Sequence, residues 1–364
     1  MLPPDGIYAI YYASKIGHKP GGGPASPSDD DEDDLLGDSH RISLVCSNAS
    51  HDVVAMVTPL AQRHLLVTSL VPKYSIIKKE TLALSSQDAD SSLDSSASSP
   101  SSPCGLYLIK FPATRPEHDL VLLLAHDDIE LLECFQDEID TFCRTLEPVL
   151  QKSLDNLTEP IDTLRESVQN WFSETVAFLC STLLLLKKHL SPFLFGALCN
   201  QLLVIDCSDE KLKSKIERLY DSCGVAASLS STAASDKDNS SPQLQSQPIL
   251  YLALDSSGDI SLSENKTNAF CDKWAEVLIR SAESSLHNIA KHLILAFKLK
   301  VAQDLNSFKR LLAASENDHY SLYSALQFLR QCQYCDIVLM LSQQDIGGPR
   351  QQAVMQLLTE FVNM

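Results

Sequence analysis

A Cys-x-x-Cys motif is the residue pattern in this sequence that comes closest to a chemical site. Cys332 and Cys335 stand near the end of the chain with two residues between them. Paired thiolates at this spacing bind zinc or exchange disulfides, but a structural zinc needs four ligands. No second Cys or His pair stands at metal spacing, and Gln333 and Tyr334 are not the central residues of a thioredoxin site. A metal- or thiol-dependent enzyme is therefore only an alternative interpretation.

Neighbouring His and Asp residues are a second pattern with chemical potential. The groups are His51-Asp52, His118-Asp119, His126-Asp127-Asp128 and Asp318-His319. Metal sites need several ligands at fixed spacing, whereas these pairs fall mostly at predicted turns or helix starts, where Asp127 is expected to act as an N-cap. The sequence also lacks a nucleophile elbow, a phosphate loop, a dinucleotide fingerprint and a His-Glu-x-x-His motif. We therefore expect no enzyme, no catalytic or metal-binding residue and no cofactor.

A protein interface is better supported than a catalytic site. The candidate interface residues are Lys298, Lys300, Lys309, Arg310, His319 and Tyr320. The cations among them would form a local stripe in an otherwise acidic protein, and such stripes set the orientation and rate of docking. The alternative is an ordinary solvated helix face, on which the long side chains lay their stems over the core.

These residues lie in a block, residues 267–341, that predicts amphipathic helices. No Gly or Pro occurs between Gly258 and Gly347. Apolar residues recur at steps of three and four, which is the period of a helix that buries one face. They are Trp274, Val277, Leu278, Leu293, Phe297, Val301, Leu305, Phe308, Leu312, Leu322, Leu326 and Leu329. We expect Trp274 and Phe297 to be core residues.

The same block resembles the C-terminal third of the Njmu protein family. The segments that carry the resemblance are Phe270-Cys271-x-x-Trp274, Phe297-Lys298-Leu299-Lys300-x-x-Gln303-Asp304-x-Asn306-x-x-Lys309-Arg310, His319-Tyr320, Phe328-Leu329-x-x-Cys332 and Asp336-Ile337, with a shorter echo in Trp171-Phe172. It is dense over roughly the last hundred residues and thin over the rest.

The resemblance implies a non-catalytic adaptor subunit of a WD-repeat protein complex at the trans-Golgi network. Such a subunit would support golgin-mediated capture of endosome-derived vesicles, and the family is also linked to spermatogenesis. The implied partners are the WD-repeat scaffold and an associated complex subunit, with golgins and a Rab-GAP-like bridging protein contacted indirectly. The implied location is cytoplasmic, at the trans-Golgi network and on vesicles through partners.

Length and charge narrow the classes of partner. A chain of 364 residues is long enough for two domains. Of the net charge of -18, residues 1–150 carry 10 Lys or Arg against 23 Asp or Glu, a net of -13, whereas residues 263–341 carry 9 against 8. A negative surface repels nucleic acids and anionic lipids. We therefore expect no nucleic-acid binding, and recruitment to membranes through other proteins.

Cysteine usage and apolar runs predict a reduced, cytosolic protein. The eleven cysteines are odd in number and, apart from Cys332 and Cys335, have no paired spacing, which is typical of buried free thiols. The start of the chain lacks the pattern of a signal peptide, and Leu2 is not the glycine of a myristoylation site. The most apolar run, residues 175–186, stops at Lys187 and is too short for a membrane span. We expect a buried helix there and no membrane insertion.

The predicted fold class is α+β, with a longin-like domain over residues 1–148. Strands are predicted at residues 7–12, 42–46, 74–84, 106–111 and 120–125, with helices at 52–66 and from 127. The order strand, strand, helix, three strands, helix resembles that of longin domains. Residues 17–39, which contain six consecutive acids, and the Ser-rich residues 85–103 are predicted to be disordered insertions.

The rest of the chain is predicted to be mainly helical. Residues 149–225 form a helical connector and the start of a second domain, residues 226–247 form a third disordered loop, and residues 248–364 form the helical C-terminal domain. The longin-like order leaves open a second alternative for function. A longin-containing subunit of a Rab guanine-nucleotide exchange factor, or a Rab effector, would bind through the sheet and first helix of the front domain.

Overall fold

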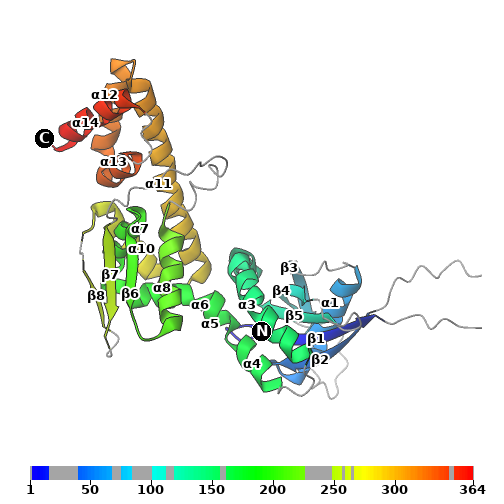
Figure 1. Cartoon of the computed structure of the whole chain (residues 1–364). Coiled ribbons are helices and arrows are strands. Elements are labelled where there is room, and N and C mark those ends of the chain that lie inside the picture. Colours follow the sequence, from blue (N-terminus) through cyan, green and yellow to red (C-terminus); the bar gives the residue numbers. More distant parts are fainter. Residues whose placement is uncertain are drawn as a thin grey trace, which may run out of the picture. The chain divides into compact units, whose positions relative to one another are not determined.

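The computed structural model divides the chain into two compact units, Met1–Ala177 and Phe178–Met364 (Figure 1). It describes residues 2–15, 40–67, 75–83, 101–111, 119–155, 161–225, 248–255, 259–263, 266–343 and 348–363. The predicted disordered insertion at 17–39 and the predicted loop at 226–247 lie outside these residues, as does most of the insertion at 85–103. We describe each unit by itself.

The first unit is built on a five-stranded antiparallel sheet. Its strands are β1 (Ile7–Lys15), β2 (His40–Ser47), β3 (Ser75–Ala83), β4 (Ser101–Phe111) and β5 (Asp119–His126), in the order β2-β1-β5-β4-β3. Helix α1 (His51–Val67) follows β2, and α2 (Ile129–Cys134) and α3 (Gln136–Asp155) follow β5. The element order predicted for a longin-like domain is therefore confirmed, except that the last helix is divided at Phe135.

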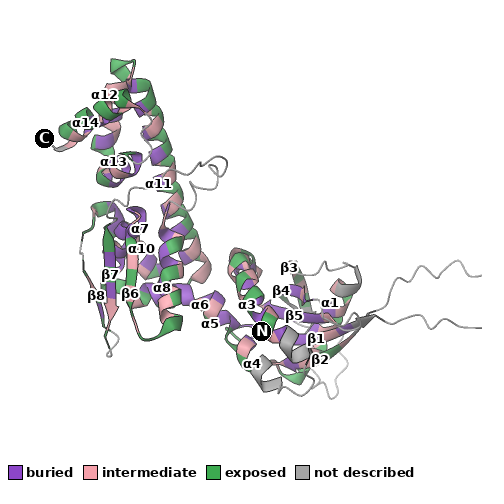
Figure 2. Cartoon of the chain, in the orientation of Figure 1, coloured by how far each residue is buried: buried purple, intermediate pink, exposed green. Residues whose placement is uncertain are grey.

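The central strands of this sheet are apolar on both faces because helices cover both. Residues 120–125 of β5 are all buried, which Figure 2 shows as a purple strand. On one face, Val57 and Ala61 of α1 join a core cluster with alternate residues of β1, β4 and β5. On the other face, the Tyr107 hydroxyl donates to Asp140 of α3 at 2.6 Å. Burial of both faces explains why β5 reads as a continuous apolar run instead of an alternating one.

The first unit continues past residue 148, where the predicted domain ended. Helices α4 (Ile161–Gln169) and α5 (Trp171–Thr175) belong to it, and α3 contacts both. The Trp171 ring is fully buried and meets Phe172 edge to face at 5.6 Å. Gly6, at φ +66°, leaves no room for a side chain, since a Cβ there would lie 2.7 Å from the Trp171 ring. The Trp171-Phe172 pair therefore completes the first unit.

Two local predictions in this unit need correction. The N-cap of α2 is Asp128, which accepts from the Leu131 amide at 3.2 Å, and not Asp127. Asp127 instead accepts from the backbone N–H of Leu2 at 3.1 and 3.0 Å, because the N-terminal segment folds back on the end of β5. Residues 101–103, predicted to be disordered, are part of β4, where they pair with residues 81–83 of β3 and extend the ladder beyond the apolar run.

The second unit begins with helices and a small sheet. Helices α6 (Ala177–Leu186) and α7 (Leu190–Leu198) are joined by the single 3-10 turn η1 (Lys187–His189). Strand β6 (Leu202–Asp206), helix α8 (Glu210–Cys223) and strand β7 (Ile249–Leu254) follow, with β6 and β7 parallel. Strand β8 (Ile260–Leu262) pairs antiparallel with β7, giving the order β6-β7-β8. Five helices complete the unit: α10 (Ala269–Glu283), α11 (His287–Ser315), α12 (His319–Gln331), α13 (Cys335–Gln343) and α14 (Pro349–Asn363).

The apolar helical stretch Ala177–Leu198 is longer than the sequence suggested. The apolar run stops at Lys187, but the chain passes through η1 without leaving the helical path, so the helical stretch continues to Leu198. Among the described residues this is the one helical stretch long and apolar enough to cross a membrane, with a mean hydropathy of 1.3. However, 61% of it is buried within the fold, and a core helix passes the same test of length and composition.

The long helix α11 is held by aromatic packing on its inner face. Phe297 is fully buried, stacks on Phe270 of α10 at 5.5 Å and meets Trp274 edge to face at 5.7 Å. Further along, Phe308 stacks on Phe328 of α12 at 5.9 Å. The buried residues of α11 are Ala290, Ile294, Phe297, Val301, Leu305, Phe308, Leu312 and Ser315. Their spacing of three and four residues places them on one face, which sets the rotation of the whole helix.

We expect Phe297→Ala to lower the free energy of unfolding by about 3–5 kcal/mol, because it removes the ring that α10 and α11 share and leaves a cavity. Leu299→Ala is the matched control: it lies two residues away on the same helix with 57% of its surface exposed, so its effect should stay within about 0.5 kcal/mol. Urea unfolding followed by far-ultraviolet circular dichroism measures both. Equal losses for the two variants would contradict this assignment of inner and outer faces.

Candidate protein interface

Helix α11 presents a second stripe on the side away from its buried face. At about 100° per residue, residues separated by three or four positions line up along the helix, and one such set is exposed or half-buried. We call this set the outer stripe; it consists of Leu295, Leu299, Ala302, Asn306, Arg310 and Ala313. Leu295 and Leu299 are 50% and 57% exposed. Figure 2 shows buried and exposed residues alternating along α11, as expected of a helix with two distinct sides.

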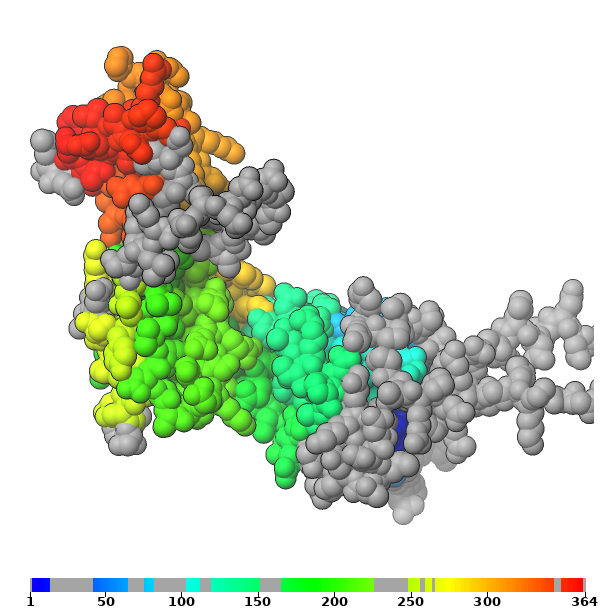
Figure 3. Space-filling view, in the orientation of Figure 1, coloured from blue at the N-terminus to red at the C-terminus, as the bar shows by residue number. Residues whose placement is uncertain are grey.

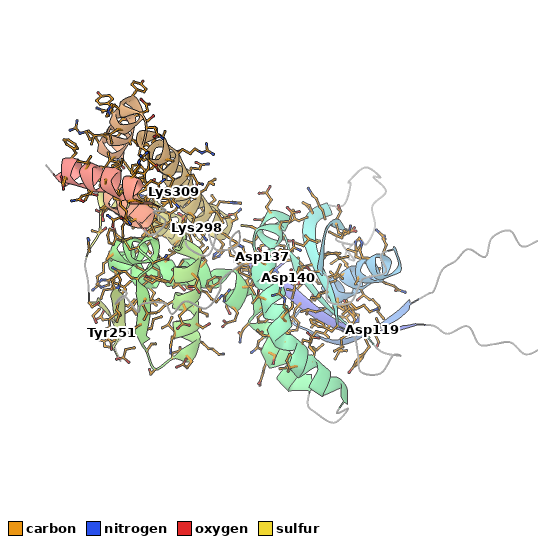
Figure 4. The ribbon with its side chains drawn as sticks, turned by 45° about the horizontal axis from the view of Figure 1, so that its top comes forward. Asp119, Asp137, Asp140, Tyr251, Lys298 and Lys309 are labelled. Atoms are coloured by element: carbon orange, nitrogen blue, oxygen red, sulfur yellow. The ribbon has the colours of Figure 1, made fainter. Side chains whose placement is uncertain are left out.

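Three of the predicted cations adjoin the outer stripe. Lys298 and Lys309 are eleven residues apart, which brings them to within about 20° of each other around the helix axis. Figure 4 shows both on α11. Arg310 belongs to the outer stripe and is exposed. Lys298 and Lys309 therefore share one flank of the outer stripe, whereas Arg310 lies about 100° around the helix from Lys309.

Lys300 lies elsewhere and does not continue this stripe. It is about 160° around the helix from Lys298, and its ammonium group pairs with Asp304 at 2.9 Å. Asp304 also accepts a hydrogen bond from the Tyr334 hydroxyl, just before α13 begins. Burial, followed by the bond to Asp304, raises the pKa of Tyr334 above its ordinary value. Lys300 and Asp304 therefore tie α11 to the start of α13, so the predicted cations do not form a single stripe.

Lys298 lies near the end of α8. Burial raises the pKa of the Cys223 thiol, the last residue of α8, to about 12; a hydrogen bond from Ser222 and the positive charge of Lys298 oppose that rise. Lys298 itself is half-buried. Its stem therefore covers apolar surface beside α8 while its charge borders the outer stripe.

His319 and Tyr320 are on a different helix. They open α12, where Asp318 is the N-cap and accepts from the amides of Tyr320 and Ser321, both at 3.0 Å. The Ser321 hydroxyl also donates to Asp318. This hydrogen bond, followed by the two amide hydrogen bonds, lowers the pKa of the Asp318 carboxyl. Tyr320 is 76% exposed, and Tyr323, one turn later, is 58% exposed. The two predicted residues stay interface candidates, but they are not part of the α11 stripe.

Several residues of the His and Asp pairs have structural partners. His126 contacts the Pro4 carbonyl through Nε2 at 3.1 Å and stacks on Phe172. Asp119 pairs with Lys110 at 2.5 Å, while His118 lies outside the described residues. Among the described residues, no group of three or more His, Cys, Asp or Glu side chains could hold a metal ion.

Cys332 and Cys335 are free thiols at the break between α12 and α13. Burial raises the pKa of Cys332 to about 11, with Asp304 and Cys335 adding to the rise. Burial also raises the pKa of Cys335. A reactive cysteine needs the opposite shift, since the thiolate is the nucleophile and the metal ligand. The surroundings of this pair therefore do not activate either thiol.

Sequence reasoning missed two exposed apolar surfaces. One is the leucine pair of the outer stripe. The other is the outer face of the small sheet, formed by Leu202, Val204, Ile249 and Tyr251, which are between 37% and 52% exposed. Figure 3 shows the side chains of β7 and β8, in yellow, at the surface of the second unit. The sequence signal was ambiguous, because the apolar run at 202–205 is equally typical of a strand buried on both faces.

Comparison with known proteins links the chain to one family. Residues 115–364 match the Njmu-R1-like protein family. The chain is 25% identical over 236 residues to the protein Njmu-R1 of Mus musculus, an alignment that covers 64% of this chain. The same alignment spans 58% of the length of the mouse protein. No solved structure matches the chain.

We expect Cys332 to react slowly with iodoacetamide at pH 7.5. Raising its pKa from 9.0 to about 11 lowers the thiolate fraction about a hundredfold at that pH, and the rate should rise about tenfold per pH unit until pH approaches 11. The measurement is a time course of labelling, read by mass spectrometry of the peptide that contains Cys332. The same residue in the urea-unfolded chain is the control. Native and unfolded rates that agree at pH 7.5 would restore the thiol-dependent enzyme as an alternative.

Proposed function

Because the chain belongs to the Njmu-R1-like protein family, we propose that it is a non-catalytic adaptor subunit of a WD-repeat protein complex at the trans-Golgi network. In this role it supports golgin-mediated capture of endosome-derived vesicles, with a further link to spermatogenesis. The resemblance predicted from residues 267–341 is confirmed, and the match begins at residue 115, within the first unit.

The observation that carries the adaptor proposal is the outer side of α11. A helix whose inner face already packs against α10, α12 and α13 retains exposed Leu295 and Leu299 beside Lys298, Lys309 and Arg310. Apolar contacts give affinity at a protein interface, and cations at its rim steer the approach of an acidic partner. This arrangement supports binding to another protein.

The proposed partners follow the family resemblance. The direct partners are the WD-repeat scaffold and an associated complex subunit, while golgins and a Rab-GAP-like bridging protein are contacted indirectly. The proposed location is cytoplasmic, peripheral at the trans-Golgi network and on vesicles. Recruitment runs through these partners because a chain with a net charge of -18 is repelled by anionic lipid surfaces.

We expect the variant Lys298→Glu, Lys309→Glu, Arg310→Glu to lose the WD-repeat scaffold, because three charge reversals turn an attractive rim into a repulsive one. The measurement is affinity purification of the tagged full chain from cells, with quantitative mass spectrometry of the recovered proteins. The loss should be about tenfold or more, which corresponds to about 1.4 kcal/mol.

The matched control is Lys188→Glu, Lys211→Glu, Lys273→Glu. It makes the same change in net charge at three exposed lysines of the same unit, on η1, α8 and α10, and should retain the scaffold. If both variants recover the WD-repeat scaffold, the adaptor function stands but α11 is not part of the interface. Absence of any WD-repeat protein from the wild-type sample would count against the adaptor function itself.

The element order of the first unit favours a second candidate function. The unit has the predicted order of a longin-like domain, so a subunit of a Rab exchange factor or a Rab effector is the runner-up. This function predicts that the full chain accelerates release of labelled GDP from at least one Rab protein, or binds its GTP form, and a panel of purified Rab proteins measures both. If the chain neither accelerates GDP release from any Rab protein of the panel nor binds its GTP form, this second candidate is wrong and the adaptor function is the remaining proposal.

A further inference from the structure

Strand β6 is an apolar edge strand in which no residue is buried. Its sequence is Leu202-Leu203-Val204-Ile205-Asp206. It stands at the end of the order β6-β7-β8, and among the residues that the structure describes no strand pairs with its other side. Leu202 and Val204 are 52% and 37% exposed on the outer face of the sheet, while Leu203 and Ile205, on the opposite face, are only half-buried. The strand therefore lacks the cover that its aliphatic side chains call for on both faces.

The side of β6 that faces away from β7, which we call the open side, presents backbone groups of two residues. In a parallel ladder, alternate residues of a strand bond to the same neighbour. The Leu202 N–H donates to the Pro248 carbonyl at 2.9 Å, which begins the ladder with β7, and the register is regular over residues 202–206. The N–H and C=O groups of Leu203 and Ile205 therefore point to the open side.

Helix α8 closes one end of the open side. The Tyr220 hydroxyl donates to the Gln201 carbonyl at 2.9 Å, and the Gln201 N–H donates to the Gly196 carbonyl at 3.1 Å. Because Gln201 belongs to the same alternate row as Leu203 and Ile205, the available stretch begins at Leu203. It offers two donors and two acceptors, which suits an extended segment of about five residues.

The other edge strands of the two described sheets carry features that oppose further pairing. Exposed edges are templates for another strand, and natural proteins protect them with charges, bulges or short strands. Strand β3 has Lys78, Lys79 and Glu80 at its centre, the pairing of β2 with β1 is irregular, and β8 has only three residues. Strand β6 has no such feature within its aliphatic run, since its one charge, Asp206, is its last residue.

An extended segment is the occupant that these backbone groups select. A helix satisfies its N–H and C=O groups within itself, so it cannot pair with those of Leu203 and Ile205. A strand repeats its donors and acceptors at the same spacing as β6. Because β6 is apolar on both faces, the added strand should carry consecutive apolar residues and not an alternating pattern.

We propose that β6 is the site at which a partner protein adds an extended apolar segment to the sheet as its fourth strand. The proposal adds a second surface to the adaptor function, and it rests on that function only for the existence of a protein partner. The partner segment should be about five residues long, apolar on both faces and free of Pro. An acid opposite Asp206 would weaken the pairing, because like charges directly opposite each other repel.

Other occupants fit the open side less well. In an antiparallel pair of two β6 strands that bonds Leu203 of one copy to Ile205 of the other, Leu202 would face Asp206, an apolar side chain against a carboxylate. Both copies also carry a net charge of -18, which opposes their association. An anionic membrane or a nucleic acid is repelled by the same charge, and neither offers a row of amide groups that matches a strand.

The first test is site-specific photo-crosslinking of the tagged full chain in cells. A diazirine amino acid replaces Val204 in one sample and Ile249 in the control, since both side chains are exposed on the outer face. Strands lie about 4.8 Å apart, so an added strand is next to Val204 but two strand spacings from Ile249 on β7. We expect position 204, and not position 249, to join a segment of another protein that contains at least about four consecutive apolar residues.

The second test asks whether the crosslinked segment pairs as a strand. A synthetic peptide of that segment is added to the purified full chain, and hydrogen exchange of single amides is followed by nuclear magnetic resonance. The amides of Leu203 and Ile205 should exchange about tenfold more slowly or less with the peptide bound, because they gain acceptors. The amides of Leu202 and Val204, which already bond to β7, are the internal control and should change less. Protection without this alternation would contradict strand addition.

The third test removes one backbone donor. Leu203→Pro deletes an N–H on the open side and leaves the ladder with β7 intact, so recovery of the crosslinked partner should fall about tenfold or more. Leu203→Val keeps the amide and should change recovery less than about twofold. Circular dichroism checks that both variants remain folded. Equal recovery by the two variants would overturn the proposal.

A second pair of variants leaves every backbone group in place. Val204→Lys puts a charge on the edge strand, which is how natural edges are protected, and should also reduce recovery of the crosslinked partner. Ile249→Lys makes the same change on the same face of the sheet, one strand farther in, and should reduce it less. Equal losses would indicate a partner that covers the outer face instead of extending the sheet, and would contradict the proposal.

The outcomes separate strand addition from the adaptor function. Crosslinks from position 204 to a segment without an apolar run, to another copy of this chain, to its own residues 226–247, or to no protein would overturn strand addition. The adaptor function survives each of these results if the WD-repeat scaffold is still recovered. An extended apolar segment joined at position 204, with the alternating protection but without any WD-repeat protein, would uphold strand addition and overturn the adaptor function.

Discussion

The packing of Phe297 against α10 is the contact on which the rest of the second unit depends. Its ring is fully buried between Phe270 and Trp274, and burying such a ring stabilises a fold by about 1.5–3 kcal/mol relative to leaving it exposed. Because side chains on a helix are fixed relative to one another, seating this one ring determines the direction of every other residue of α11. The outer stripe faces solvent as a direct consequence.

The electrostatics of α11 follow from the same rotation. Lys300 and Asp304 fall on the flank that meets α13, so their charges cancel locally and Asp304 holds Tyr334. Lys298 and Lys309 fall on the opposite flank, where no acid of α11 lies. Asp304, the only acid of α11, is thus used in contacts with Lys300 and Tyr334.

Periodicity in the sequence predicted the order of the elements well, but it did not predict which contacts the polar residues of each element make. The order of strands and helices in the first unit and the helical block at the end follow from apolar spacing and breakers. That spacing could not tell that Lys300 would pair with Asp304, since a cation beside an acid four residues away reads as an ordinary surface pair. Nor could it tell that Asp127 would bind the Leu2 amide and leave capping to Asp128, because the contact joins residues 125 positions apart.

The segments that carried the family resemblance are informative for the same reason. Many residues of these segments are buried, among them Phe270, Cys271, Phe297 and Leu329. Much of the resemblance therefore reflects the core and the packing of α11 against it. A shared core makes the shared surface predictable only where the helix rotation is fixed. That condition holds for α11, because Phe297 stacks on Phe270 and Phe308 stacks on Phe328.

Exposed apolar residues alone would not distinguish the outer stripe from the small sheet. The face formed by Leu202, Val204, Ile249 and Tyr251 is about as exposed as Leu295 and Leu299, and single exposed apolar residues are ordinary on protein surfaces. Beside the sheet face, Asp206 accepts a hydrogen bond from the Tyr251 hydroxyl at 2.9 Å. On α11, exposed Leu295 and Leu299 lie beside small residues and cations of the same helix.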